Sequence, residues 1–148
     1  MSVSASKKRT KTQELKGLLR TAGLRATAAR VRVLECLQEA SGPLSHAQVC
    51  ELLADEPFDR ATLYRNLTDL VTVELARRRD LGDHIWRFEL IEDEDHEGGH
   101  PHFICTTCGD VSCLPEDALS FQKQPKLPAA VMAKAVDIQI RGVCDACE

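Results

Sequence analysis

Apolar residues recur at helical spacing in four segments of the first half of the chain. The first stripe, within residues 15–19, stops ahead of Gly23, a residue type that commonly terminates helices. Thr27, Ser45 and Asp59 each precede a further stripe, and their side-chain oxygens can cap the free N–H groups at a helix start. The pattern therefore predicts four short helices separated by tight turns.

A strand-like alternation replaces the helical period after the fourth helix. The segments "ELARRRD" (74–80) and "HIWRFEL" (84–90) are separated by the turn residues "LGD", an arrangement typical of a β-hairpin. A hairpin that follows three or four short helices indicates a winged helix-turn-helix domain, which we assign to residues 13–91.

The segments outside residues 13–91 do not show the pattern of short helices followed by a hairpin. Residues 1–12 are polar and basic, and we expect a flexible basic arm that either stays solvated or touches phosphates. Residues 92–99, rich in acids and glycine, are the predicted hinge. Beyond it, the strand candidates "HFIC" and "DVSCL", a helix after Pro115 and the strand-like run "VMAKAVDIQIRGVC" predict a small α/β domain over residues 100–148. The predicted fold class is α+β.

Composition and charge narrow the class of protein. With 43% hydrophobic and 28% charged residues among 148, the chain is typical of a soluble globular protein. No secretory signal follows Met1 and no segment is long and apolar enough to cross a bilayer, so we expect a cytoplasmic protein without a membrane partner. Residues 1–80 carry 14 Lys and Arg against 10 Asp and Glu, whereas residues 81–148 carry 5 against 13. The basic first half indicates a polyanion partner.

The fourth predicted helix, "RATLYRNLTDLVTV", combines an apolar face suited to a core with a polar face suited to DNA. At 100° per residue, the polar face and its flanks hold Ala61, Thr62, Tyr64, Arg65, Thr68 and Asp69. Arginine can bind both major-groove acceptors of guanine, and hydroxyl groups commonly bind phosphates. The alternative is an amphipathic helix with a merely solvated face. The hairpin and the preceding basic residues favour DNA. These basic residues are Arg20, Arg25, Arg30 and Arg32.

Two Cys-x-x-Cys pairs predict a structural metal site. Cys105 and Cys108 form the first pair, and Cys144 and Cys147 form the second. This spacing is typical of a four-thiolate zinc site, in which each pair supplies two corners of a tetrahedron. We expect one structural zinc per chain, which in so small a domain would supply much of the folding free energy.

A second cluster of metal ligands lies near the predicted hinge. His100 and His102 point to one face of an extended segment, and Cys113 belongs to neither cysteine pair. With His84 and Glu89 at the end of the wing, these residues predict a second metal site, although which of the two completes it stays open. The thiolate favours zinc over hard cations. A redox role for Cys113 also stays open. Buried thiols account for the two remaining cysteines, Cys36 and Cys50.

Four of these segments resemble the ferric uptake regulator (Fur) family of bacterial metal-dependent repressors. They are "AGLRATAARVRVLECL", "FDRATLYRNLTDLV", "HPHFICTTCG" and "GVCDAC". The resemblance implies a homodimer with an N-terminal winged-helix domain, a C-terminal dimerisation domain, a structural zinc and a regulatory metal at the hinge. It implies that Tyr64 and Arg65 contact DNA and that Arg25 reaches the minor groove. Residues that align with regulatory ligands are Glu89, His100, His102 and Cys113.

Departures from the family pattern refine these expectations. Pro43 stands where many members have a histidine ligand, so His84 or His46 is a candidate substitute. Gly99 and Pro101 replace residues that serve an additional metal site in some members, so we expect two metals per chain. Cys113 stands where iron and peroxide sensors usually carry a carboxylate. The resemblance therefore favours the zinc-uptake regulator branch, with iron and manganese as the alternative regulatory metals.

The resulting hypothesis is a metal-dependent transcriptional repressor that binds a palindromic operator in double-stranded DNA. Metal at the hinge would select one orientation of the two domains and so act as co-repressor. The alternatives are an iron- or peroxide-responsive regulator, or a zinc-stapled DNA-binding protein without metal sensing. An enzyme is not expected, because the sequence has no nucleophile motif or signal of a substrate pocket.

Overall fold

Four helices and a three-stranded sheet form the N-terminal unit of the computed structural model, which describes residues 3–91, 100–124, 126–133 and 136–148. This unit comprises residues up to Ala40 together with Leu44–Ile91, and the C-terminal unit comprises Ser41–Pro43 with the residues from position 92 onward. Among the described residues, no helix combines the length and apolar character needed to span a membrane.

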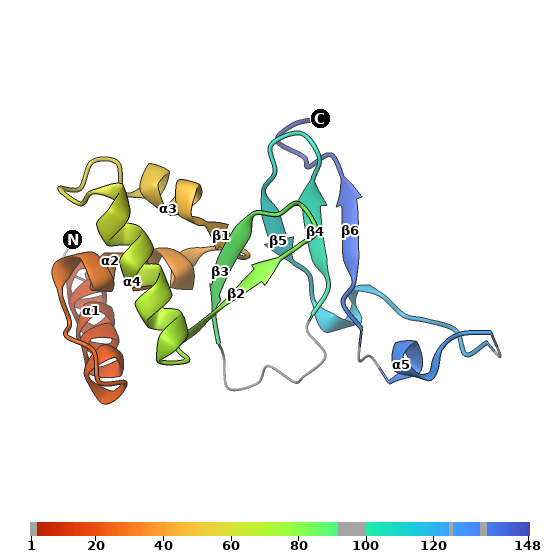
Figure 1. Ribbon diagram of the computed structural model, residues 1–148, viewed down its shortest axis with the longest axis horizontal. Coiled ribbons are helices and arrows are strands. Elements are labelled where there is room, and N and C mark those ends of the chain that lie inside the picture. The colour runs from red at the N-terminus through yellow and green to blue at the C-terminus, as the bar shows by residue number, and fades with distance from the viewer. Residues whose placement is uncertain (1–2, 92–99, 125, 134–135) are drawn as a thin grey trace. The chain divides into compact units, whose positions relative to one another are not determined.

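The helices of the N-terminal unit are α1 (Val3–Thr21), α2 (Ala28–Glu39), α3 (His46–Leu52) and α4 (Arg60–Thr72), labelled in Figure 1. The three predicted caps are confirmed. Thr27 and Asp59 accept from the backbone N–H groups of the third helical residue, and Ser45 forms a reciprocal capping box with Gln48. Helix α3 ends at Leu52.

The start of α1 corrects the expectation of a flexible arm. Residues 3–12 are helical, and only residues 1 and 2 of the predicted arm lie outside the described chain. Lys11 bonds to Glu39 at 2.9 Å and the Thr12 hydroxyl bonds to Glu35 at 3.2 Å, which ties this part of α1 to α2. The segment lacks apolar periodicity, but its Ala, Lys and Arg residues favour helix and extend α1 backwards from these bonds.

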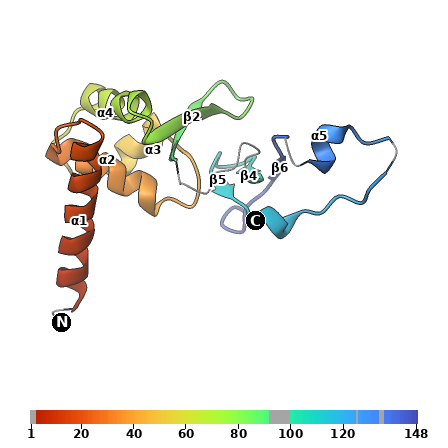
Figure 2. The same ribbon diagram turned by 90° about the horizontal axis from the view of Figure 1, so that it is seen from below.

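The predicted hairpin is confirmed as β2 (Ala76–Asp80) and β3 (Trp86–Leu90), which pair antiparallel. The two-residue strand β1 (Leu44–Ser45) pairs with the other edge of β3, giving the sheet order β1-β3-β2. Helix α2 packs against α1, α3 and α4, and Figure 2 shows it beside α1. Phe88 and the buried leucines of α1, α2 and α4 share one core with Val31, Val33 and Val49. Helices and wing thus form a winged helix-turn-helix.

The C-terminal unit is built on a second three-stranded sheet. Strand β4 (His102–Cys105) lies between β5 (Val111–Cys113), which is antiparallel to it, and β6 (Gln139–Gly142), which is parallel to it. The helix predicted after Pro115 is a single 3-10 turn, η1 (Glu116–Ala118). Among the described residues of the strand-like run predicted from Val131, only β6 is a strand. The first two residues of that run end the short helix α5 (Ala129–Met132) instead.

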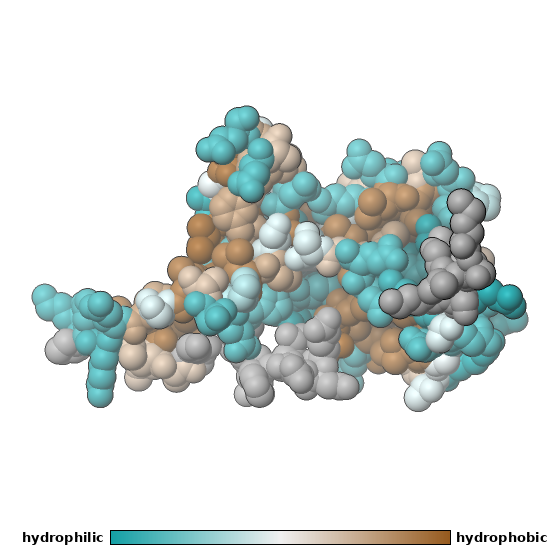
Figure 3. Space-filling model, turned by 180° about the vertical axis from the view of Figure 1, so that it is seen from behind, coloured by the Kyte–Doolittle hydropathy of each residue, from teal (hydrophilic) through white to brown (hydrophobic). Residues whose placement is uncertain are grey.

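Among the described residues of the C-terminal unit, few form an apolar core. Ile104, Cys105 and Val111 are buried, whereas Phe121, Met132 and Val143 remain more than two-fifths exposed. Figure 3, a space-filling view of one face of the molecule, shows apolar residues in brown and tan that reach the surface among hydrophilic ones in teal. The described part of this unit therefore has little of the hydrophobic burial that normally stabilises a domain.

Candidate metal centres and nucleic-acid interface

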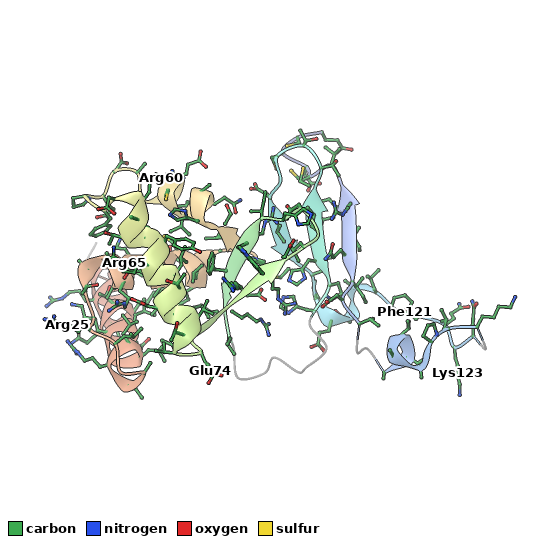
Figure 4. All side chains as sticks on the ribbon, in the orientation of Figure 1. Arg25, Arg60, Arg65, Glu74, Phe121 and Lys123 are labelled. Carbon is green, nitrogen blue, oxygen red and sulfur yellow. The ribbon has the colours of Figure 1, made fainter. Side chains whose placement is uncertain are left out.

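Helix α4 exposes the residues that the sequence predicted as its DNA-binding face. Its N-cap, Asp59, accepts from the Thr62 N–H at 2.6 Å, which fixes the first turn of the helix. Leu63, Leu67 and Leu70 are buried in the core, so the opposite face turns outward. On that face Ala61, Tyr64 and Arg65 are exposed, and Thr62 is half-buried. Figure 4 labels Arg60 and Arg65 on α4 and Arg25 on the turn ahead of α2.

Two of the four basic residues that favoured DNA have structural partners instead. Arg30 bonds to Asp69 at 2.7 Å and joins α2 to α4. Arg32 pairs with Glu35 in its own helix and with Glu56 at 2.9 Å. Asp69 lies 39 residues from Arg30, and Glu56 lies 24 residues from Arg32. Periodicity alone cannot reveal partners at such separations. Arg20 and Arg25 are exposed.

The four cysteines of the two Cys-x-x-Cys pairs converge at one end of the second sheet. Cys105 ends β4 and Cys108 lies in the turn that follows, where Gly109 has a φ of +77°. Cys144 and Cys147 follow β6, which is parallel to β4, so both pairs reach the same end. All four Sγ atoms lie within 4.8 Å of one another.

The spacing of the sulfur atoms fits a tetrahedral zinc ion. Cys108 Sγ lies 3.8 Å from Cys144 Sγ. With Zn–S bonds of about 2.3 Å, two corners of a tetrahedron are about 3.8 Å apart. The distance between these two sulfur atoms thus fits a shared zinc ion without rearrangement.

Backbone N–H groups lower the pKa of one thiol in this cluster, whereas crowding of the sulfur atoms raises the pKa of another. The N–H groups of Cys108, Cys144 and Thr107 point at Cys105 Sγ from 3.4–3.5 Å, and lower the pKa of Cys105 to about 6. The neighbouring thiols, Cys144 first among them, raise the pKa of Cys147 to about 12. Four sulfur atoms this close cannot all ionise unless a cation compensates them, which is the charge requirement that a zinc ion meets.

The structure brings together three residues of the second predicted site within the C-terminal unit. His102 and Cys113 are cross-strand partners on β4 and β5, and the His100 and His102 rings are 4.8 Å apart between centroids. The ligand atoms of the three residues lie within 4.8 Å of one another. His102 is buried, and the other two are half-buried. Two imidazoles and a thiol at this separation fit a borderline-soft divalent metal such as zinc.

The two candidates for a further ligand lie in different environments within the N-terminal unit. Glu89, on β3, accepts hydrogen bonds from Arg77 and Arg79. His84 occupies the hairpin turn at a φ of +61°, and its side chain is 95% exposed.

His46, the other candidate substitute, has partners inside the N-terminal unit. Its Nε2 lies 2.8 Å from the Arg60 carbonyl oxygen and 3.3 Å from Cys50 Sγ. The ring also meets Tyr64 edge to face, with centroids 5.3 Å apart. These contacts place His46 and Cys50 beside the first turn of α4, a role that the sequence did not suggest. Cys36 is half-buried, and burial raises the pKa of its thiol.

Comparison with known proteins identifies the family. The sequence model of the ferric uptake regulator family matches residues 21–141. The chain belongs to the ferric uptake regulator family.

Individual members of the family are similar over most of their length. The ferric uptake regulation protein of Legionella pneumophila is 30% identical over 135 residues, which cover 88% of this chain and 96% of the relative. That of Escherichia coli K12 is 29% identical over 109 residues, or 72% of this chain and 71% of the relative.

Solved structures of the family have the same fold. The Vibrio cholerae ferric uptake regulator matches with a TM-score of 0.65 and 25% identity, over 87% of this chain and 98% of that one. A zinc-bound manganese uptake regulator matches with a TM-score of 0.62 and 20% identity, over 88% and 98% of the two chains. The winged helix, the second sheet and the cysteine cluster are thus features of a metal-dependent transcription regulator that binds DNA.

Proposed function

We propose that this protein is a zinc-responsive repressor, in which a second zinc, distinct from the structural one, controls binding to DNA. The convergence of His100, His102 and Cys113 supports this proposal most directly. Two nitrogen donors and one sulfur donor form a set that zinc accepts readily, whereas manganese prefers oxygen ligands. The four-cysteine cluster would hold the structural zinc.

Glu89 is the fourth regulatory ligand in this proposal. It lies on a regular strand, is one of the regulatory ligands that the family resemblance implies, and has a carboxylate that zinc can bind. His84 is the less suitable candidate, because it occupies an exposed turn. Glu89 belongs to the N-terminal unit and the other three ligands to the C-terminal unit, so a metal bound by all four would restrict how the units are oriented.

The proposed repressor acts as a homodimer on a palindromic operator. The exposed side chains of Phe121, Met132 and Val143 supply apolar surface for dimerisation through the C-terminal unit. With the orientation of the units restricted, the two α4 helices of a dimer acquire a defined spacing, which matches two half-sites. Arg65, Tyr64 and their neighbours Ala61 and Thr62 would face the major groove, and Arg25 the minor groove.

An iron-responsive regulator is the second candidate. It is favoured by the names of the similar proteins from Legionella pneumophila and Escherichia coli, which are ferric uptake regulation proteins. The thiol of Cys113 distinguishes the two candidates, since a sulfur ligand shifts the preference of the site toward zinc.

The test compares metal content with DNA binding on the same samples. Full-length protein is stripped with a mild chelator, and DNA binding is followed by fluorescence anisotropy on a duplex selected from a random pool by the zinc-loaded protein. We expect two zinc ions per chain to fall to one, with loss of DNA affinity that zinc restores at lower free concentration than iron or manganese. Cys113→Ser should abolish the response and keep one zinc, whereas Cys36→Ser, the matched thiol control, should behave as wild type.

Two results would contradict the proposal. Unchanged DNA affinity after removal of the second zinc would show a DNA-binding protein in which zinc has only a structural role. If ferrous iron restores DNA binding at a lower free concentration than zinc does, iron rather than zinc is the regulatory metal.

A further inference from the structure

The wing carries a cluster of charged side chains on one of its two faces. In the β2–β3 ladder, Arg77 is the cross-strand partner of Glu89, and Arg79 is the partner of Arg87. Residues directly opposite one another, and residues two apart on a strand, share a face, so these four side chains lie together. Phe88, on the opposite face, is buried in the core.

Two guanidinium groups hold the same carboxylate oxygen of Glu89. Arg77 Nε donates to Glu89 Oε1 at 2.8 Å, and Arg79 Nε donates to the same oxygen at 2.5 Å. The third arginine of this face, Arg87, bonds to Asp83 at 2.8–2.9 Å. Glu89 is therefore engaged by two cations of its own sheet.

This arrangement bears on the proposed function, in which Glu89 is a ligand of the regulatory metal. A metal ion at Glu89 competes with charge-assisted hydrogen bonds for the electron pairs of the carboxylate. The two guanidinium charges also repel a divalent cation that approaches the same oxygen.

We propose that Arg77 and Arg79 form an arginine clamp on Glu89 that competes with the regulatory metal and sets the metal concentration at which the regulator responds. The clamp weakens metal binding, so that only zinc above a threshold concentration captures the carboxylate. This inference rests on the proposed role of Glu89 and adds a determinant of affinity that does not itself bind the metal.

Arg79→Gln is the informative variant, because it removes the charge and shortens the side chain while keeping a polar group. Loss of one charge-assisted hydrogen bond should raise the zinc affinity of the regulatory site roughly tenfold. Arg78→Gln is the matched control. Arg78 lies on the same strand but on the opposite face, with its guanidinium 4.4 Å from the centre of the Trp86 ring.

Zinc affinity is measured on full-length protein by competition with a chromophoric chelator, with the structural zinc retained. The melting temperature of the stripped protein provides a second readout. Arg79→Gln should lower this melting temperature, because the clamp also stabilises the wing. The same variant should enlarge the increase in melting temperature that zinc produces. Arg77→Gln should act in the same direction, and Arg78→Gln should leave the zinc affinity unchanged within about twofold, as expected for a surface change away from the site.

A double-mutant cycle separates the clamp from a general effect of charge. In a Glu89→Gln background, Arg79→Gln should no longer raise zinc affinity, since the carboxylate for which metal and arginine compete is gone. An equal gain in both backgrounds, or no gain in either, would overturn the clamp.

The same cycle keeps failure of the clamp distinct from failure of the proposed site. If Glu89→Gln weakens zinc binding but Arg79→Gln does not strengthen it, Glu89 remains a ligand and the clamp is wrong. If Glu89→Gln leaves zinc affinity unchanged, Glu89 is not a ligand, and both the clamp and the fourth position of the proposed site fail.

Discussion

Arg65 is the single side chain from which we expect base recognition. It is exposed on the first half of α4, next to Tyr64, and helix capping by Asp59 fixes the turn that precedes it. A guanidinium at this place can donate to both major-groove acceptors of a guanine, a contact that discriminates bases by about 1–3 kcal/mol.

Replacement of this side chain should therefore relax specificity. We expect Arg65→Ala to weaken binding to the selected duplex by roughly 10- to 100-fold, with a much smaller effect on random DNA. Fluorescence anisotropy with both duplexes at fixed salt measures the two affinities. Lys123→Ala removes an exposed cation from the C-terminal unit and serves as the control. Equal losses on selected and random DNA would show that Arg65 binds phosphate only.

At the scale of elements, the ion pair between α2 and α4 holds the recognition helix against the core. Arg30 Nη2 lies 2.7 Å from Asp69 Oδ2, and Arg30 Nη1 donates to the Arg25 carbonyl oxygen at 2.7 Å. One side chain thus connects α2, α4 and the turn that presents Arg25. The Arg30 side chain is 13% exposed, so water replaces these bonds poorly if the guanidinium is removed.

Loss of this connection should reduce both stability and DNA affinity. We expect Arg30→Ala to lower the free energy of unfolding by about 1–3 kcal/mol, the cost of leaving a charged partner unsatisfied. Urea unfolding followed by circular dichroism measures the change. Arg20→Ala should alter stability by less than about 0.5 kcal/mol, as exposed substitutions usually do. A loss for Arg30→Ala as small as that of the control would show that the ion pair contributes little.

At the scale of the whole molecule, the two units depend on different sources of stability. The N-terminal unit has a continuous core of buried leucines and valines around Phe88. In the part of the C-terminal unit that the structure describes, Ile104 and Val111 are among the few buried apolar side chains. The four-cysteine cluster joins the end of β4 to the segment after β6, so a bound metal supplies the cross-link that this small core lacks.

Removal of the structural zinc should therefore unfold one unit and spare the other. With a strong chelator under native conditions, we expect amides of β4, β5 and β6 to lose protection against hydrogen exchange. Amides of α2 and α4 should stay protected, and the dimer should dissociate. Hydrogen exchange read by mass spectrometry, with size-exclusion chromatography on the same sample, tests this. Persistent protection in β4 without zinc would show that the C-terminal unit folds on its own.

Much of the local structure was predictable, because it depends on neighbours in the sequence. The caps at Thr27, Ser45 and Asp59 act on N–H groups three residues away, and the wing turn lies within a short segment. The helical start of α1 was missed, since its support comes from Glu35 and Glu39 on the next helix. Contacts between distant residues leave no periodic signal.

The sequence by itself determined the kinds of chemistry present: two Cys-x-x-Cys pairs, a pair of histidines with a further cysteine, and a helix with one polar face. Only the tertiary structure decided their surroundings. Parallel pairing of β4 with β6 brings the two cysteine pairs together, and the register of β4 with β5 places His102 opposite Cys113. The wing register likewise places Glu89 between two arginines. Ligand spacing is a local property of the chain, whereas strand partners and the charges around a ligand are set by long-range packing.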